Sequence, residues 1–192
     1  MNKILYIVDK DEQNDYHYDI SEDTIIYHYS INCSTHVELN LVKEGVKVYY
    51  YNNVINYDDN TFTISVNHKS SNTHSELYNH GVNVLHHKFD FIVNGSVSKE
   101  SSKCICNQEN QIINMKDGKS TIFPNLFIDN YDVESSHSAY IGKFSFEKVF
   151  YMMSRGISKE DANHLLLNGF LIGSDSIDLH KIELFVKEIE KI

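Results

Sequence analysis

The chain has 192 residues, a formal net charge of −10, one proline and no tryptophan. This length suits one domain with a real core, and 41 % hydrophobic against 23 % charged residues excludes a disordered chain. Because 17 Lys and Arg are outnumbered by 27 Asp and Glu, no general cationic field exists, which argues against a nucleic-acid partner.

The start of the chain is not expected to act as a targeting signal. Its apolar run at residues 4–8 ends at Asp9 and is too short for a signal peptide or a membrane span. We therefore expect a cytoplasmic protein with no membrane partner. The three cysteines, Cys33, Cys104 and Cys106, are too few for a disulfide framework. The abundance of Asn, Ile, Tyr and Lys is typical of an AT-rich genome and is expected to carry little functional information.

From Met1 to about Gly142, apolar and polar residues alternate, which predicts strands with one face on a core. The alternation is plainest at residues 37–42, 46–50, 62–66 and 89–93. Turn residues at 58–60, 94–95 and 117–118 separate these runs. Many short strands without helices between them indicate a sandwich, a barrel or a β-solenoid, and no strict short repeat selects among the three.

Residues 143–192 change to a helical period. The first predicted helix has an apolar stripe, and Gly156 is suited to end it in a left-handed conformation. Ser158 with Asp161 predicts the cap of a second helix, which the Asn-Gly pair at 168–169 would weaken or end. The stripe of the first helix consists of Phe146, Val149, Phe150 and Met153.

A third helix is expected from near Ser176 or Asp178. Its apolar face consists of Ile182, Phe185, Val186 and Ile189. We therefore divide the chain into a β body at residues 1–142 and a helical segment at 143–192. Since no linker separates the two, the helical segment is expected to pack against the β body.

The sequence contains few signs of catalysis. No histidine falls in a His-Glu-x-x-His motif, no cysteine pair has zinc-finger spacing, and no metal ligand is predicted. Cys104 and Cys106 would share one face of a strand, where they are interpreted as small packed side chains. His68 and His74 flank a polar stretch that is interpreted as a surface loop. Phosphate loops and nucleophile elbows are also absent from the sequence, which favours a binding or scaffold protein over an enzyme.

Two blocks near the C-terminus carry a more specific signal. Residues 124–142 read PNLFIDNYDVESSHSAYIG, and residues 150–158 read FYMMSRGIS. These blocks resemble the C-terminal part of the SufB/SufD family of iron–sulfur cluster assembly proteins, and SufD more than SufB. The resemblance covers residues 60–175 well and is weaker before them.

The resemblance implies a mainly β fold, a right-handed parallel β-helix followed by a small C-terminal helical segment. In that family SufB and SufD pair through their β-helices, and each binds the ATPase SufC through its helical segment. The resemblance therefore implies a non-enzymatic scaffold subunit that binds SufC and pairs with a SufB-like subunit or with itself. It implies no tightly bound cofactor, only a transient iron–sulfur cluster shared with a partner.

The family also suggests roles for individual residues. His137 matches a histidine implicated in cluster assembly near the pairing interface. The cysteine expected two residues earlier is Ser135, which argues against direct cluster ligation there. Because strand-like sequence begins near Met1, a shortened subunit is expected. The residues that match the SufC-binding segment are Phe150, Tyr151, Arg155, Gly156, Ile157 and Phe170.

The residues alone leave other interpretations open. His137 would also suit a histidine held by a hydrogen bond at the end of the β body, and the helical aromatic residues would suit ordinary core packing. The alternative function is a stand-alone β-solenoid that binds a metal or small ligand through surface histidines, as a storage protein or a hydrolase.

Overall fold

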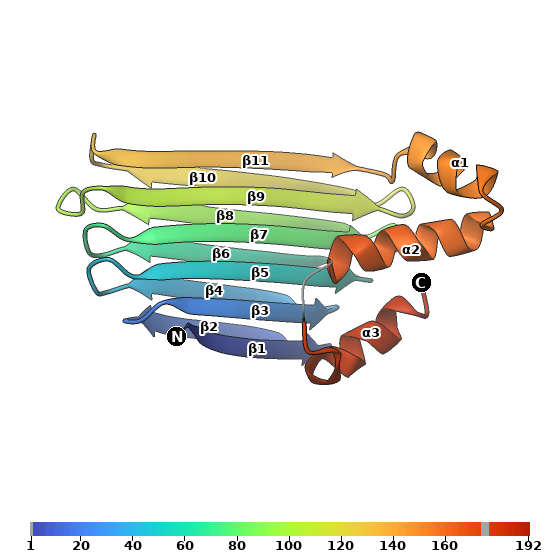
Figure 1. The fold of residues 1–192 in the computed structure, drawn as a ribbon, viewed down its shortest axis with the longest axis horizontal. Coiled ribbons are helices and arrows are strands. Elements are labelled where there is room, and N and C mark those ends of the chain that lie inside the picture. The colour runs from blue at the N-terminus through green and yellow to red at the C-terminus, as the bar shows by residue number, and fades with distance from the viewer. Residues whose placement is uncertain (1, 174–176) are drawn as a thin grey trace.

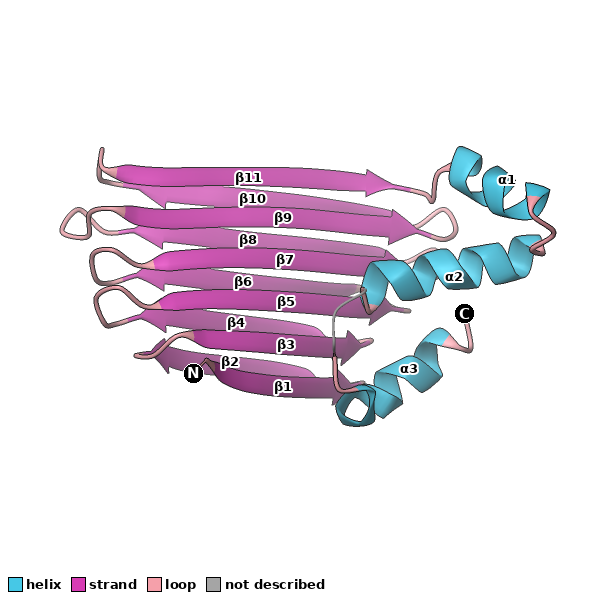
Figure 2. Cartoon of the chain, in the orientation of Figure 1, coloured by secondary structure: helices cyan, strands magenta, loops and turns pink. Residues whose placement is uncertain are grey.

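A computed structural model describes residues 2–173 and 177–192, which form a stack of parallel β-coils with helices beside one end of the strands (Figure 1). Each coil contributes one strand to each of two facing sheets (Figure 2). This arrangement confirms the predicted β-helix followed by a helical segment. Among the described residues, no helix is long and apolar enough to cross a membrane.

Every strand pairs in parallel with strands of the coils next to it. The six-stranded sheet contains, in spatial order, β1 (Lys3–Lys10), β3 (Thr24–Ile31), β5 (Lys47–Asn56), β7 (His74–Asn83), β9 (Cys104–Asn114) and β11 (Val133–Gly142). The five-stranded sheet contains β10 (Lys119–Ile128), β8 (Lys88–Val97), β6 (Asn60–His68), β4 (Ser34–Leu41) and β2 (Gln13–Ile20).

The coils are not equal in length. Paired residues are separated by 21 positions between Lys3 and Thr24, and by 31 positions between His74 and Ile105. The strands themselves lengthen only from 8 to 11 residues, so the turns take up much of the difference. A solenoid of this kind contains no constant repeat in its sequence.

The alternating strands bury one face between the two sheets, as predicted. Val37, Leu39 and Leu41 of β4 are fully buried in this core. The prediction of a turn at residues 94–95 is wrong, because both lie inside β8. A Cβ on Gly95 would lie 2.6 Å from the Cys106 Sγ, so glycine is needed here for close packing between the sheets.

Asparagine side chains connect successive turns of the stack. The Asn60 Nδ2 donates to the Asn32 Oδ1 at 3.0 Å, and the Asn56 Nδ2 donates to the Asn83 Oδ1 at 3.1 Å. Asn32 has a φ of 53°, in the left-handed region that asparagine tolerates well. Part of the abundance of asparagine is therefore structural.

The helical segment contains α1 (Phe146–Ser154), α2 (Lys159–Leu171), the 3₁₀ helix η1 (Leu179–Ile182) and α3 (Glu183–Ile189). The predicted cap of α2 is confirmed, since the Ser158 Oγ accepts the Asp161 N–H at 3.0 Å. The Asn-Gly pair at 168–169, predicted to weaken or end this helix, does not end it, because buried Leu167 and Leu171 hold the helix through Gly169 to Leu171. Asp178 caps η1, whereas Ser176 lies outside the described residues.

Helices α2 and α3 cover the outer face of the six-stranded sheet near the ends of its strands (Figure 1). Phe185 of α3 packs edge-on against Tyr29 of β3, with ring centroids 4.9 Å apart. The Lys10 Nζ also donates to the Glu188 Oε2 at 3.1 Å. The helices and the outer face of the sheet together form a second apolar cluster, which includes Ile31, Ile55, Val82, Ile113, Leu167, Leu171, Ile182 and Ile189.

Candidate functional site

In the last coil of the described stack, β11 is largely exposed and β10 is mostly half-buried. Within the described residues, β11 is the outermost strand of its sheet, so its free edge presents unpaired backbone donors and acceptors. Exposed apolar side chains lie on the same coil, among them Phe123, Phe127 and Ile141. This coil therefore offers a surface to which another β-sheet can add.

His137 lies on β11, in register with Gln108 of β9. Strand alternation puts His137 on the same side as Val133, which packs against the core between the sheets. His137 is nevertheless exposed, because the described chain adds no further coil over this side. Its imidazole is thus accessible at the open end of the stack.

The cysteines lie behind this surface. Ser135 of β11 pairs in register with Cys106 of β9. The Cys106 thiol therefore lies one coil behind Ser135, which is the position of the cysteine in the SufB/SufD family. All three cysteines are free and buried. Burial raises the pKa of the Cys106 thiol to about 11, which keeps it protonated at neutral pH. Cys106 is therefore a packed core residue here, as the sequence predicted for the pair Cys104 and Cys106.

The C-terminal end of α1 presents aromatic and basic side chains to solvent. Phe150 and Tyr151 are both exposed. The guanidinium of Arg155 lies over the ring of Tyr151, 5.2 Å from its centroid. Gly156 has a φ of 87°, which confirms the predicted left-handed end of this helix.

Phe170 differs from these residues, because it packs against the β body. Its ring stacks on His80 of β7, with centroids 4.6 Å apart, and meets Phe144 at 6.2 Å. Burial lowers the pKa of His80, although Glu109 opposes this shift. Ile157 is half-buried. The predicted SufC-binding residues therefore divide into an exposed group on α1 and a group packed inward.

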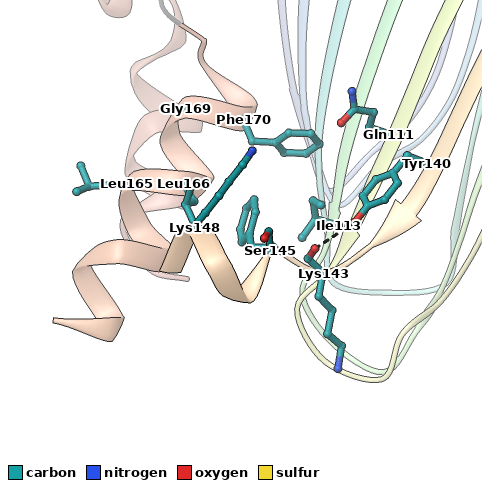
Figure 3. Close-up of a pocket in the computed structure, with 11 residues that line it drawn as sticks. Gln111, Ile113, Tyr140, Lys143, Ser145, Lys148, Leu165, Leu166, Gly169 and Phe170 are labelled. Carbon is teal, nitrogen blue, oxygen red and sulfur yellow. Dashed lines mark hydrogen bonds between the residues drawn. The ribbon is translucent and has the colours of Figure 1, made fainter. Parts of the chain in front are cut away.

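A cavity of about 520 Å³ lies between α1, α2 and the ends of β9 and β11. Figure 3 shows Phe170 pointing from α2 into this cavity, toward Gln111 and Tyr140. A second hollow of about 500 Å³ lies against α1 and shares Lys143 and Phe144 with the first. Apolar side chains of α1 line it, including Val149, Phe150 and Met153.

No sequence motif singles out Phe144, Lys148 or Tyr140, which line the first cavity. Their convergence depends on how α1 and α2 cross the end of the sheet, and residue spacing does not predict that crossing. The sequence predicts an apolar stripe on α1, yet only Val149 of that helix is buried. An amphipathic helix left uncovered in this way is typical of a surface that binds a partner.

The chain matches a family described as "SUF system FeS cluster assembly, SufBD core domain" over residues 32–170. It is 31 % identical over 111 residues to an iron–sulfur cluster assembly protein SufD of Bacillus subtilis, covering 57 % of this chain and 25 % of that protein. It is 43 % identical over 70 residues to a SufBD family protein of Pyrococcus horikoshii, covering 36 % of this chain and 15 % of that protein.

A third relative is the iron–sulfur cluster assembly protein SufB of Bacillus subtilis, 42 % identical over 57 residues, which are 29 % of this chain and 12 % of that protein. The matched part of the chain spans a quarter or less of each of these three relatives. The family match itself covers most of the chain, including the coils from β4 onward, α1 and most of α2. The chain therefore belongs to the SufBD core family.

Proposed function

We propose that this chain is a non-catalytic scaffold subunit of a SUF-type iron–sulfur cluster assembly complex. Its membership of the SufBD core family and the names of its SufD and SufB relatives support this role. The observation that carries the proposal is the exposed aromatic and basic surface of α1, which lies inside the family match. In this role the subunit holds its partners in position, and the cluster is cargo.

The partner proposed for α1 is the ATPase SufC. Phe150 and Tyr151 are 60 % and 59 % exposed, and Arg155 lies over the Tyr151 ring. Aromatic residues and arginine dominate the binding energy of protein interfaces, especially beside pockets that exclude water. The two hollows beside α1 provide such pockets for side chains of the ATPase.

The second proposed contact joins two β-helices through the last coil. A SufB-like subunit or a second copy of this chain would cover the open side of β10 and β11 and satisfy the free edge of β11. Burial of apolar residues that face the open side, such as Ile122 and Leu126 of β10 and Ile141 of β11, would stabilise the contact. The free edge would also gain backbone hydrogen bonds.

This pairing would bring His137 to the interface between two subunits. A neutral imidazole is a suitable ligand for iron, whereas the hydroxyl of Ser135 is a poor substitute for a thiolate. Cys106 is buried with a raised pKa, so it is not a ready source of a thiolate. We therefore assign His137 to assembly of the nascent cluster, with thiolate ligands from the partner.

A binding measurement tests the SufC contact. The full chain is titrated with the SufC protein of the same organism, and Phe150→Ala combined with Arg155→Ala is expected to weaken binding at least about thirty-fold if one of the two is a hot spot. The matched control is Phe127→Ala, which removes an equally exposed aromatic ring (59 %) from the β body and should leave the affinity unchanged. Failure of the unmodified chain to bind SufC would contradict this contact.

Light scattering during size-exclusion chromatography tests the pairing, first with the chain alone and then with a SufB subunit. His137→Glu with Ala139→Glu introduces charge on the open inner side of β11 and is expected to prevent pairing in both experiments. The control, Ser136→Glu with Ser138→Glu, introduces the same charge on the outer face of the same strand. Equal pairing by both double variants would argue against the open side as the interface.

A further inference from the structure

Two histidines and two carboxylates, side chains of types that can ligate metals, lie together on the outer face of the five-stranded sheet, far from the last coil. Asp15 and His17 alternate along β2, and His36 and Glu38 alternate along β4. The register pairs Asp15 with His36 and His17 with Glu38. Because alternate residues of a strand share a face, the four side chains form a square with the two imidazoles on one diagonal.

Three of their atoms lie close enough to share one ion. The Asp15 Oδ1 is 3.1 Å from the His17 Nε2 and 3.0 Å from the His36 Nδ1. All three ligand atoms lie within 4.8 Å of one another. Ligand atoms around a tetrahedral zinc ion with bonds near 2.1 Å are separated by about 3.4 Å, so small side-chain movements suffice.

The fourth side chain orients one of these ligands. The Glu38 Oε2 lies 3.1 Å from the His17 Nδ1, the ring nitrogen that faces away from the shared position. Glu38 is itself held by the Asn67 Nδ2, which donates to its Oε1 at 3.2 Å. Asn67 in turn accepts a hydrogen bond from the Ser96 Oγ at 2.7 Å. A carboxylate that fixes the second nitrogen of a ligating histidine is a regular feature of protein metal sites.

Space for further ligands is present beside the three atoms. Asp15 and His36 also line a surface hollow of about 570 Å³, with Ser34, Thr61 and Thr63 among its other lining residues. Three protein ligands beside an open position are typical of sites that bind water or a small molecule on the metal. Two imidazoles with one carboxylate suit ions such as Fe²⁺ and Zn²⁺ rather than Mg²⁺ or Ca²⁺.

The geometry points to a site for one divalent transition-metal ion, ligated by Asp15, His17 and His36 and supported by Glu38. A second group, Asp58, Asp59 and His87, lies around the β5–β6 and β7–β8 turns. There the His87 Nδ1 lies 3.5 Å and 3.4 Å from the two carboxylates. This second group has one imidazole where the first has two, and no paired strand register aligns its side chains. His87 therefore serves as a control.

The test uses the full chain without an affinity tag, freed of metal by a chelator. Zn²⁺ is titrated calorimetrically in air and Fe²⁺ under anaerobic conditions, and one ion per chain is expected. His17→Asn with His36→Asn should weaken binding at least about 100-fold, and Glu38→Gln about 10- to 100-fold, as for other residues that orient a ligand. His87→Asn and His180→Asn should leave the affinity unchanged.

Circular dichroism checks that each variant is folded, which is expected because His17 and His36 are 56 % and 42 % exposed. Unchanged binding by the double histidine variant would overturn the site, as would loss of the ion in His87→Asn. Absence of binding by the unmodified chain would also overturn it. Unchanged binding by Glu38→Gln would overturn the role of Glu38 alone.

Discussion

His68 provides a pH-dependent contribution to stability that the structure quantifies. Its ring is 1 % exposed. The Thr73 hydroxyl donates to the Ser70 carbonyl, so the His68 Nδ1 donates to the Thr73 Oγ1 at 2.7 Å. The Ser75 Oγ lies 2.9 Å from the Nε2 and donates to it. The neutral ring therefore has a partner on both nitrogens, and only the charged ring is opposed by burial.

Burial, with a smaller effect from the charge of His74, lowers the pKa of His68 from 6.5 to about 4. Below pH 6.5 the unfolded chain binds a proton at this histidine, whereas the folded chain does not until the pH approaches 4. Acid therefore favours the unfolded chain. The stability that the neutral ring of His68 contributes is present above pH 6.5 and is lost as the pH falls toward 4. The expected loss in the free energy of unfolding is about 2 kcal/mol between pH 7 and pH 5.

Urea unfolding at pH 7 and pH 5 measures this loss in the unmodified chain and in His68→Gln. The variant should lose about 2 kcal/mol less between the two pH values, because glutamine does not titrate. Buried His28 and His80 also have lowered pKa values, but they are present in both proteins and cancel in the comparison. His86→Gln, at an exposed histidine, should behave as the unmodified chain.

An equal loss in His68→Gln and in the unmodified chain would refute the reasoning. Should His68→Gln fail to fold, nuclear magnetic resonance of the unmodified chain gives the same answer. The ring of His68 should remain neutral at pH 5, and a charged ring at that pH would refute the assignment.

Three further predictions concern packing and reactivity. Gly95→Ala should lower the free energy of unfolding by about 1–3 kcal/mol, because the new Cβ would lie 2.6 Å from the Cys106 Sγ. Gly169→Ala in α2 meets nothing within 4 Å and should raise the free energy of unfolding by about 0.5–1 kcal/mol. Urea unfolding that ranks the two variants in the opposite order would contradict this packing. Phe185→Ala should cost about 3–5 kcal/mol in the same assay, and a cost below about 1 kcal/mol would show that α3 contributes little. At pH 8 iodoacetamide should leave Cys106 unmodified in the folded chain and modify it in urea, because the thiol is buried with a pKa of about 11, and rapid modification of the folded chain would be inconsistent with that burial.

The local elements follow closely from residue patterns. The alternation at residues 37–42 and 62–66 identifies β4 and β6 because one face of each strand is buried and the other is polar. The cap at Ser158 is equally local, since it depends on the hydroxyl of one residue and the N–H of another three positions later. Such features need no knowledge of distant parts of the chain.

The stacking of the coils was not visible in residue spacing. Paired residues are 21 positions apart at Lys3 and Thr24 but 31 apart at His74 and Ile105, so no repeat marks the register. Local pattern predicts a turn at Gly95 for the same reason, because its close neighbour Cys106 lies in the next coil. The residue pattern is compatible with a sandwich, a barrel or a β-solenoid, and the family resemblance is what predicts the β-solenoid.

One of the functional surfaces can be found from the sequence and the other cannot. The aromatic and basic residues of α1 were identified through the family blocks, and they are exposed as a partner surface requires. The square of Asp15, His17, His36 and Glu38 was missed, because its two halves lie on separate strands. No motif joins residues whose proximity depends on strand register.

The return of the helical segment to the first coils changes how this stack should unfold. In a simple solenoid each coil contacts only its neighbours, so the ends can fray independently. Here η1 packs on β1, α3 on β3 and α2 on β7, and Lys10 bonds to Glu188. Loss of the first coil therefore also removes contacts of the C-terminal helices, which couples the two ends of the chain. We expect a single cooperative unfolding transition instead of stepwise loss of coils from one end.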